Sequence, residues 1–161
     1  MKNLRYFTMA ALAIITLASC EKTEDTIKTV DETNQKGAFT IEFEHRFDGS
    51  NLMLNQNYTN GSGEDLTFNK VRYYVSNITL EKMDGTVWTQ ENSYYLVDAG
   101  DLASLEIKLE DVPAGEYHKL SYLIGVDSLR NVSGAQDGAL SPNNDMFWSW
   151  NSGYIFAKFE G

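Results

Sequence analysis

Apolar and polar side chains alternate with a period of two residues along much of this chain, and this pattern constrains its fold more than any other feature. From Phe39 to Phe47 the odd positions are apolar or His and the even positions are polar. The same alternation returns at 105–110 and at 117–126. Successive side chains of a β-strand point to opposite faces of the sheet. The period therefore predicts β-strands, each with one face toward a core.

Turns and loops between these segments complete the prediction of an all-β fold. No window of about a dozen residues carries a helical period. Between Leu66 and Leu80 the apolar positions change phase near Asn77, which predicts a bulge or a bend. We predict an antiparallel β-sandwich in which a long loop, Asp127–Asn144, precedes a last aromatic strand, Tyr154–Phe159. Turn residues close the predicted hairpins at Asp84-Gly85 and at Pro113-Ala114-Gly115.

Residues 1–19 have the pattern of an export signal. Lys2 and Arg5 precede a short apolar run, and the sequence Leu-Ala-Ser-Cys ends at Cys20. The apolar run is too short to cross a bilayer as a helix of the mature protein. The Leu-Ala-Ser-Cys pattern resembles a bacterial lipobox, which implies that 1–19 is removed and that Cys20 becomes the first residue of a lipoprotein, acylated with palmitate or similar chains. The alternative is an ordinary secretory signal with an incidental Cys.

The residues after Cys20 are polar and largely charged. This composition predicts a flexible acidic tether over 20–37 and one folded domain over 38–161. Glu21 and Glu24 belong to an acidic run that resembles the signals directing lipoproteins of Bacteroidetes-type bacteria to the outer leaflet. We therefore expect attachment through lipid to the cell envelope, at the outer membrane, on its periplasmic face or at the cell surface.

Composition and motifs exclude several classes of function. Cys20 is the only cysteine, so a lipid on Cys20 leaves none for a disulfide, a thiolate metal site or a nucleophile. The formal net charge is −10 at pH 7, which argues against nucleic-acid binding. The chain has no nucleophile elbow, no phosphate-binding glycine loop and no zinc-ligand spacing. We therefore expect neither an enzyme nor a nucleic-acid partner.

The stretch Asp145–Gly161, DMFWSWNSGYIFAKFEG, is the most aromatic part of the chain. Aromatic surface at this density must be buried or bind a ligand. Together with five earlier motifs in order, it resembles the MbnP-like family of periplasmic or lipid-anchored proteins, which are associated with methanobactin and linked to copper. The earlier motifs are FEHRFDG at 43–49, VRYYVSN at 71–77, YLVD at 95–98, PAGEY at 113–117 and IGVD at 124–127.

The resemblance implies a β-sandwich that binds copper, with a Trp that a di-haem peroxidase-like partner enzyme oxidises to kynurenine. Trp148 and Trp150 share a phase, so they are the candidates for site-lining or oxidisable residues, with packing as the alternative. The chain also departs from the family pattern. Asn131 is followed by Val132 where some relatives carry His, and the four-cysteine signature of some members is missing. Relatives continue beyond the position of Gly161 into further strands with another His, which predicts an unpaired sheet edge here.

His45 is the leading candidate copper ligand, because imidazole suits copper. The alternative is a buried neutral His that a hydrogen bond satisfies. Met146 is a candidate soft donor, and His118 lies at a strand start where we expect it to be exposed. The cluster Asn143-Asn144-Asp145 has ligands for a hard cation such as calcium, but it lacks the rest of a calcium-loop pattern. Turn chemistry is therefore favoured for this cluster.

A lipid-anchored cell-envelope protein that binds copper is the function that these features favour. The alternative is a surface module without a metal, which binds a glycan or a protein partner through exposed Trp and Tyr side chains. Copper analysis of the purified protein distinguishes the two functions.

Overall fold

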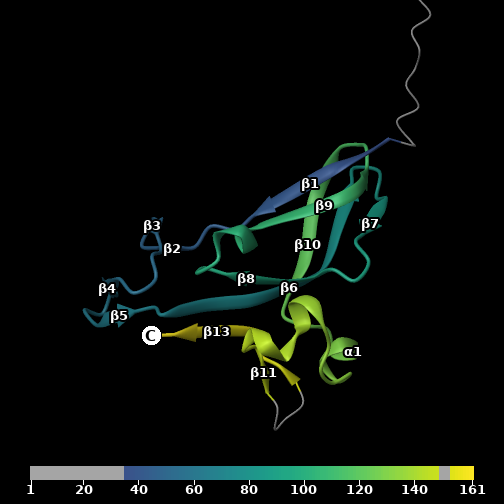
Figure 1. Ribbon diagram of the computed structural model, residues 1–161. Coiled ribbons are helices and arrows are strands. Elements are labelled where there is room, and N and C mark those ends of the chain that lie inside the picture. Colours follow the sequence, from purple (N-terminus) through teal and green to yellow (C-terminus); the bar gives the residue numbers. More distant parts are fainter. Residues whose placement is uncertain (1–34, 149–152) are drawn as a thin grey trace, which may run out of the picture. The chain divides into compact units, whose positions relative to one another are not determined.

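The computed structural model describes residues 35–148 and 153–161, and all of them belong to one compact unit, Asp31–Gly161 (Figure 1). The predicted signal peptide, Cys20 and Trp150 lie outside the described residues. The strands are β1 (Lys36–Glu42), β2 (Arg46–Phe47), β3 (Ser50–Asn51), β4 (Asn57–Thr59), β5 (Asp65–Thr67), β6 (Lys70–Lys82), β7 (Val87–Thr89), β8 (Tyr94–Asp98), β9 (Glu106–Pro113), β10 (Tyr117–Ile124), β11 (Phe147–Trp148), β12 (Gly153–Tyr154) and β13 (Ala157–Glu160). The short helices are η2 (Leu102–Leu105), α1 (Ser128–Asn131), η3 (Gly138–Leu140) and η4 (Pro142–Asn144). No helix in the described part of the chain has the length and apolar character needed to cross a membrane.

Strand β6 is the centre of the fold, because four other strands pair with it. Its sequence, KVRYYVSNITLEK, is rich in β-branched and aromatic residues, which favour strands. Strands β7 and β8 pair antiparallel with one edge of β6, and β10 and β13 pair antiparallel with the other edge. The predicted Asp84-Gly85 turn joins β6 to β7, and Gly85 adopts the positive φ that this turn requires.

A left-handed residue interrupts β6 and confirms the bulge predicted near Asn77. Asn77 has a φ of 55°, a conformation that Asn adopts more readily than most residues. Val75 and Ile78 lie on either side of it, and both face the same core although three positions separate them. The pairing register between β6 and β10 also shifts in this region. The bulge therefore keeps the apolar side chains of a long strand on one face.

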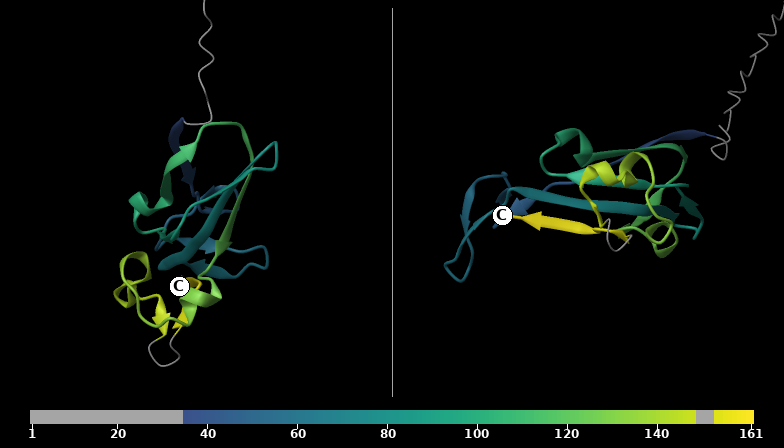
Figure 2. Two further views of the ribbon diagram at one scale, coloured as in Figure 1. Left: turned by 90° about the vertical axis from the view of Figure 1, so that its right-hand side faces the viewer. Right: turned by 60° about the horizontal axis from the view of Figure 1, so that its bottom comes forward.

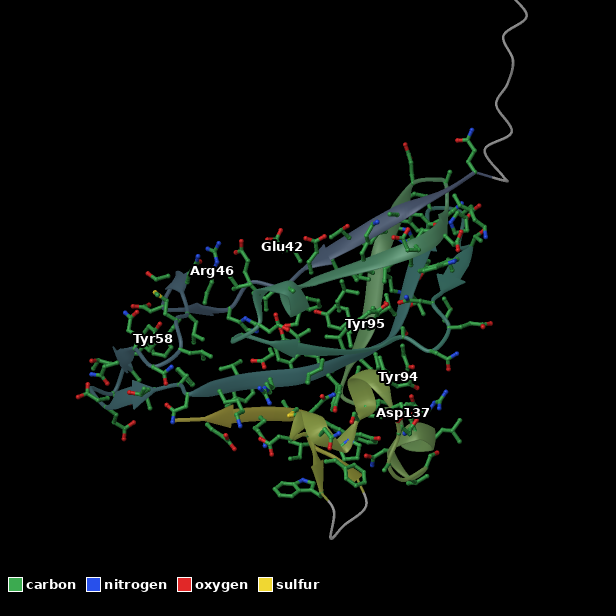
Figure 3. All side chains as sticks on the ribbon, in the orientation of Figure 1. Glu42, Arg46, Tyr58, Tyr94, Tyr95 and Asp137 are labelled. Atoms are coloured by element: carbon green, nitrogen blue, oxygen red, sulfur yellow. The ribbon has the colours of Figure 1, made fainter. Side chains whose placement is uncertain are left out.

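The five-stranded sheet carries an apolar cluster on each face. On one face, the two-stranded sheet β1–β9 packs over β6 and β8, and we call this cluster the sandwich core. On the other face, residues of the segment 126–155 pack against Tyr74, and we call this cluster the loop-side core. Tyr94 and Tyr95 are adjacent in β8 and divide accordingly, with Tyr95 in the sandwich core and Tyr94 in the loop-side core (Figure 3). Figures 1 and 2 show β1 and β9 on one side of β6, and α1 and β11 on the other. The predicted antiparallel β-sandwich is confirmed, and the long loop adds a third layer.

The first strand is displaced from its predicted limits. β1 begins at Lys36, inside the predicted tether, and ends at Glu42. The chain resumes as a strand only at Arg46, where β2 pairs with β3. The side chains still alternate, because Phe43 and His45 are half-buried and Glu44 is exposed. His45 therefore lies in the connection between β1 and β2.

The prediction of a single strand from Tyr154 to Phe159 is wrong. β12 ends at Tyr154 and pairs with β11, whereas β13 begins at Ala157 and pairs with β6. Between them, the amide of Ile155 donates to the carbonyl of Met146, and the carbonyl of Phe156 accepts from the amide of Tyr74. The backbone thus changes partners at 155–156. Tyr154 is buried as predicted, but Phe159 is 63% exposed.

The apolar side of β10 is more exposed than its alternation predicts. Of the four residues in phase, only Val126 is buried, and it follows the strand. Leu120, Tyr122 and Ile124 are between 36% and 56% exposed. The buried residues of the sandwich core come from β1, β6, β8 and β9, and β10 adds only the partly buried Tyr117.

Candidate functional site

His45 and Tyr73 form the centre of the candidate site. Nε2 of His45 lies 3.1 Å from the hydroxyl oxygen of Tyr73, and the two rings meet edge to face with centroids 5.6 Å apart. Tyr73 comes from β6, so the central strand fixes the position of the imidazole. A histidine held at one ring nitrogen has a defined orientation and leaves the other nitrogen for a ligand.

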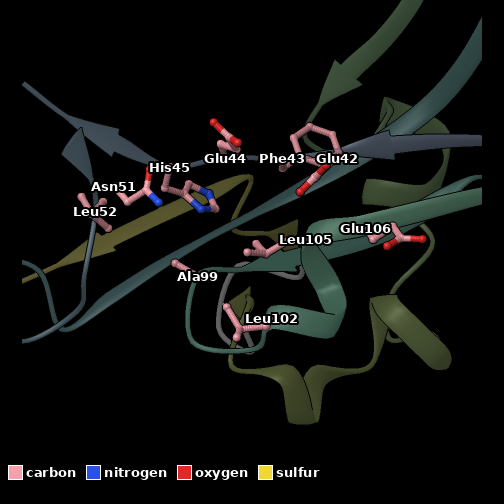
Figure 4. Close-up of a pocket in the computed structure, with 10 residues that line it drawn as sticks. All are labelled: Glu42, Phe43, Glu44, His45, Asn51, Leu52, Ala99, Leu102, Leu105 and Glu106. Atoms are coloured by element: carbon pink, nitrogen blue, oxygen red, sulfur yellow. The ribbon is translucent and has the colours of Figure 1, made fainter. Parts of the chain in front are cut away.

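A pocket of about 360 Å³ lies beside this pair. One wall comes from the connection between β1 and β3, and the other from the segment between β8 and β9, with Leu102 and Leu105 across the pocket from His45 (Figure 4). Apolar residues and three glutamates share the lining. The lining residues are Glu42, Phe43, Glu44, His45, Asn51, Leu52, Ala99, Leu102, Leu105 and Glu106. The pocket therefore combines one imidazole with acidic groups, a combination that favours a cation.

Burial sets the protonation states of the central pair. Desolvation lowers the pKa of His45, and the negative charge of Asp98 opposes this effect. Burial also raises the pKa of Tyr73 to about 12. Near neutral pH, Tyr73 is therefore a neutral phenol and the neutral form of His45 is favoured. In the tautomer with a proton on Nε2, the Nε2–H donates to the Tyr73 oxygen, and Nδ1 keeps a lone pair for a metal.

Asp98 connects this region to the layer on the far side of the sheet. The Nε of Arg72 donates to the Asp98 carboxylate at 2.7 Å, and Nη1 of the same guanidinium donates to the carbonyl of Asn144 at 3.2 Å. Ser104 fixes the backbone at Asp98, since its Oγ accepts from the Asp98 amide at 2.8 Å. The Arg72–Asp98 ion pair is largely buried, so its geometry is held by the fold rather than by solvent.

Met146 does not lie with His45. It is fully buried in the loop-side core with Tyr74, whereas His45 contacts Tyr73 on the face of the sandwich core. Adjacent residues of β6 point to opposite faces, so the sheet separates the imidazole from the thioether. His118 is exposed on β10, as expected, and does not line the pocket.

The Asn143-Asn144-Asp145 cluster forms a turn. Asp145 is left-handed with a φ of 59°, and Asn144 donates from its amide to the carbonyls of Gly138 and Ala139. Lys70 and Lys158 lie 2.8 and 2.9 Å from the Asp145 carboxylate, and their hydrogen bonds lower its pKa to about 2. Two ammonium groups thus occupy this carboxylate, which favours the turn over a calcium site.

Trp148 lies at the end of β11 and is 41% exposed. Its predicted companion, Trp150, lies outside the described residues. The structure therefore places one of the two candidate tryptophans, on the layer opposite the His45 pocket.

The sequence model of the MbnP family matches residues 36–161, a range that includes every described strand. The chain belongs to the MbnP family. No curated protein and no solved structure matches it. The family match confirms the resemblance that the motifs suggested, over almost the same residues.

In this MbnP-family chain, the pocket at His45 fits copper in part. His45 supplies an imidazole, and nitrogen with oxygen donors is a set that Cu(II) accepts. Within the described ranges, however, no group of three or more His, Cys, Asp or Glu side chains is arranged to hold a metal ion. The described residues thus provide one anchoring ligand and nearby carboxylates, rather than a complete coordination sphere.

Two residues of the site were missed by reasoning from the sequence. Tyr73 is in phase with Val71 and Val75 on a predicted strand, so the sequence predicts which face of the sheet its side chain points to. Its contact with His45, however, depends on how distant segments of the chain pack. Glu106 was assigned only to the polar side of an alternating strand, and the fold brings it to the pocket. Neither carries a local signal for the site.

Proposed function

We propose that this protein is a lipid-anchored member of the MbnP family that binds copper at the His45 pocket. The observation that carries the proposal is the orientation of His45, whose Nε2 is engaged by Tyr73 while the ring lines a pocket that three glutamates also line. A metal-binding histidine commonly donates a hydrogen bond from the N–H of its second ring nitrogen to a neighbouring oxygen, and the Tyr73 hydroxyl provides that oxygen.

The acidic lining supports the choice of a cation over an anion. Glu42, Glu44 and Glu106 give the pocket negative charge, and only Glu44 has a cationic partner, Arg46 at 2.6 Å, among the described ion pairs. Bound copper supplies a Lewis-acidic and redox-active centre.

Lipid attachment at Cys20 would place the pocket at a membrane surface. The support for it is the Leu-Ala-Ser-Cys sequence after a short apolar run, followed by a polar segment before β1. We propose the outer membrane as the location, on its periplasmic face or at the cell surface.

Copper loading with matched histidine variants tests the metal site. The chain has two histidines, so His118→Ala is the natural control for His45→Ala. The purified protein is loaded with Cu(II), passed through a desalting column and measured for copper per chain. We expect His45→Ala to lose the retained copper and His118→Ala to keep it, with thermal unfolding used to verify that both variants fold.

Two results contradict the copper proposal. Either the folded wild-type protein retains no stoichiometric copper, or folded His45→Ala retains as much as wild type. Lipid attachment is tested separately by metabolic labelling with an alkyne-tagged fatty acid in a bacterial host. Label should appear on the wild-type chain and be absent from Cys20→Ser. Equal labelling of the two chains rules out Cys20 as the anchor.

A further inference from the structure

The guanidinium of Arg130, in α1, is held in one position by its neighbours. It donates to Oδ1 of Asn92 at 2.7 Å and to Oε1 of Gln136 at 3.0 Å. Nε2 of the same Gln136 donates to the Arg130 carbonyl at 2.9 Å. The central carbon of the guanidinium also lies 5.7 Å from the centre of the Tyr94 ring, which is within the range of a cation–π contact. The fold therefore fixes this long side chain before any ligand binds.

Arg130 differs from the other arginines that the structure describes, because its charge has no carboxylate partner. Arg46 lies 2.6 Å from Glu44, in an exposed ion pair. Arg72 lies 2.7 Å from Asp98. No ion pair between described residues includes Arg130. Its two side-chain acceptors belong to neutral amides, so they orient the guanidinium without neutralising its positive charge.

A pocket of about 730 Å³ lies beside this guanidinium, and its volume is within the range of small-molecule sites. Its walls come from the start of β8, from α1 and from the segment that contains η3. Figure 3 labels Tyr94 and Asp137, which line it on two of these walls. Ala135 and Ala139 also line the pocket, and their short side chains leave its space open.

The pocket lies away from β13 and from Gly161. Tyr94 pairs with Ser76, whereas Glu160 pairs with Lys70 at the start of β6. Lys70 and Ser76 are roughly 20 Å apart along the strand. The residues that line the pocket all fall between positions 92 and 140. The walls of the site are therefore built by segments in the interior of the sequence.

Two more polar groups in the lining make no hydrogen bond with the rest of the described chain. One is the side-chain nitrogen of Asn92, since only the oxygen of that amide is engaged. The other is the carboxylate of Asp137, which precedes η3 but does not cap it. A hydroxyl group both donates and accepts, so the hydroxyls of a ligand can satisfy an amide donor and a carboxylate acceptor together. An ammonium group would satisfy only the carboxylate.

We propose that the Arg130 pocket binds a small hydroxylated carboxylate, of the class of the sugar acids. The guanidinium presents paired N–H groups in a plane, and a carboxylate matches this geometry with two parallel hydrogen bonds. Hydroxyls of the ligand bond the Asn92 amide and the Asp137 carboxylate, and its carbon skeleton lies along Ala135 and Ala139.

Charge favours a carboxylate over a phosphate in this pocket. The chain has a formal net charge of −10, and the carboxylate of Asp137 lines the pocket itself. A phosphate carries more negative charge than a carboxylate, so the same surroundings oppose it more strongly. The site is independent of copper, because Tyr94 packs in the loop-side core and His45 lies on the opposite face of the sheet.

Titration of the isotope-labelled protein with D-glucuronate, followed by NMR, tests the proposal. D-Glucose is the matched control, because it differs from glucuronate only at one carbon, where a hydroxymethyl group replaces the carboxylate. We expect glucuronate to shift the backbone amide signals of residues 135–140 in a saturable way, and glucose to leave them unchanged. Inorganic phosphate is the third probe, and we expect it to bind more weakly than glucuronate.

Three variants locate the binding. Arg130→Gln removes the guanidinium charge, and Ala135→Phe fills the pocket while leaving Arg130 in place. Arg46→Gln is the control, because it removes a guanidinium that does not line the pocket. We expect the first two to weaken glucuronate binding by at least about tenfold and the control to leave it unchanged. Thermal unfolding verifies that each variant folds, and Ala135→Phe decides the test if Arg130→Gln does not fold.

A purely structural role for Arg130 gives different results. In that case Arg130→Gln lowers the thermal midpoint, but the wild-type protein shows no saturable shifts with glucuronate. The proposal is overturned by that result, by equal binding of glucose, or by phosphate binding more tightly than glucuronate. It is also overturned if either folded pocket variant, Arg130→Gln or Ala135→Phe, binds glucuronate as tightly as wild type.

Discussion

The hydroxyl of Tyr74 gives the sharpest stability prediction, because it is buried and unsatisfied. Tyr74 is 0% exposed in the loop-side core, and its hydroxyl has no hydrogen-bond partner among the residues that the structure describes. Its neighbour Tyr154 is also buried, with the ring centroids 5.8 Å apart, but the Tyr154 hydroxyl donates to the carbonyl of Leu140 at 2.8 Å. The two tyrosines therefore differ mainly in hydrogen bonding.

Replacing each tyrosine by phenylalanine should change stability in opposite directions. A buried hydroxyl without a partner destabilises the fold by about 1–3 kcal/mol, and its removal recovers this free energy. The small void left by the oxygen destabilises the variant by roughly 0.4 kcal/mol, which reduces the gain. We expect Tyr74→Phe to raise the free energy of unfolding by about 1–2 kcal/mol. Tyr154→Phe should lower it by about 1–2 kcal/mol, because the carbonyl of Leu140 loses its donor.

Urea unfolding followed by circular dichroism measures both changes at one temperature. The midpoint should rise for Tyr74→Phe and fall for Tyr154→Phe, with unchanged slopes. Thermal midpoints should differ from wild type by about 3–5 °C for each kcal/mol in a domain of this size. A loss of stability in Tyr74→Phe comparable to that in Tyr154→Phe would refute the reasoning, since it would mean that the Tyr74 hydroxyl makes a stabilising hydrogen bond in the folded protein.

Two further predictions concern the turn at Asp145 and the contact between Gly125 and Phe156. The pKa of Asp145 is lowered to about 2 by Lys70 and Lys158, so its contribution to stability is present above its unfolded value and is lost as the pH falls toward 2. We expect the Asp145→Asn variant to be less stable than wild type at pH 6 in chemical denaturation, and Asn is chosen because it tolerates the left-handed backbone. The difference in unfolding free energy should shrink between pH 4 and pH 2. A difference that stays constant over this range would contradict the prediction. Gly125 has a φ of 126° and packs against Phe156, so Gly125→Ala should destabilise the protein by about 1–3 kcal/mol. Gly134→Ala, at a positive φ with open space around it, is the control for backbone strain alone, and equal losses would show that the Phe156 contact contributes nothing.

The strands could be predicted because their signal is local. Alternation identified β9 and most of β1 and β10, and the phase change at Asn77 located the bulge in β6. Each of these features depends on neighbouring residues in the sequence and on the fixed two-residue period of a strand. The exposure of His118 followed from its place at the start of β10.

The aromatic stretch was harder, because its residues pair with different partners. Tyr154 pairs with Phe147 in a short hairpin, whereas Phe159 pairs with Val71 on the central strand. Both lie in one apolar run, and no residue in that run signals that the backbone changes partners. Phe156, at this change of partners, packs against Gly125, whose missing side chain leaves room for the ring. A contact between residues so far apart in sequence is not visible in either segment alone.

The candidate site shows the same limit. His45 and Tyr73 are 28 residues apart, and their hydrogen bond depends on how the segment after β1 crosses β6. The alternation predicted that His45 faces inward, and the structure agrees, but the choice of Tyr73 as its neighbour is a property of the packed layers. Met146 shows the opposite outcome. Its thioether is a suitable metal ligand, but the fold buries it on the face of the sheet opposite to His45. Chemistry alone therefore names candidate ligands, and the fold decides which of them can meet.

Alternation shows which side chains share a face, but it does not show whether that face is covered. β9 and β10 have similar patterns of apolar residues, yet Ile107 and Leu109 are buried whereas Leu120 and Ile124 are exposed. The difference arises because β9 faces the five-stranded sheet across the sandwich core, whereas β10 meets that core mainly through Tyr117 and touches Phe43 through Tyr122. The sequence of β10 is thus that of a core strand at an edge position.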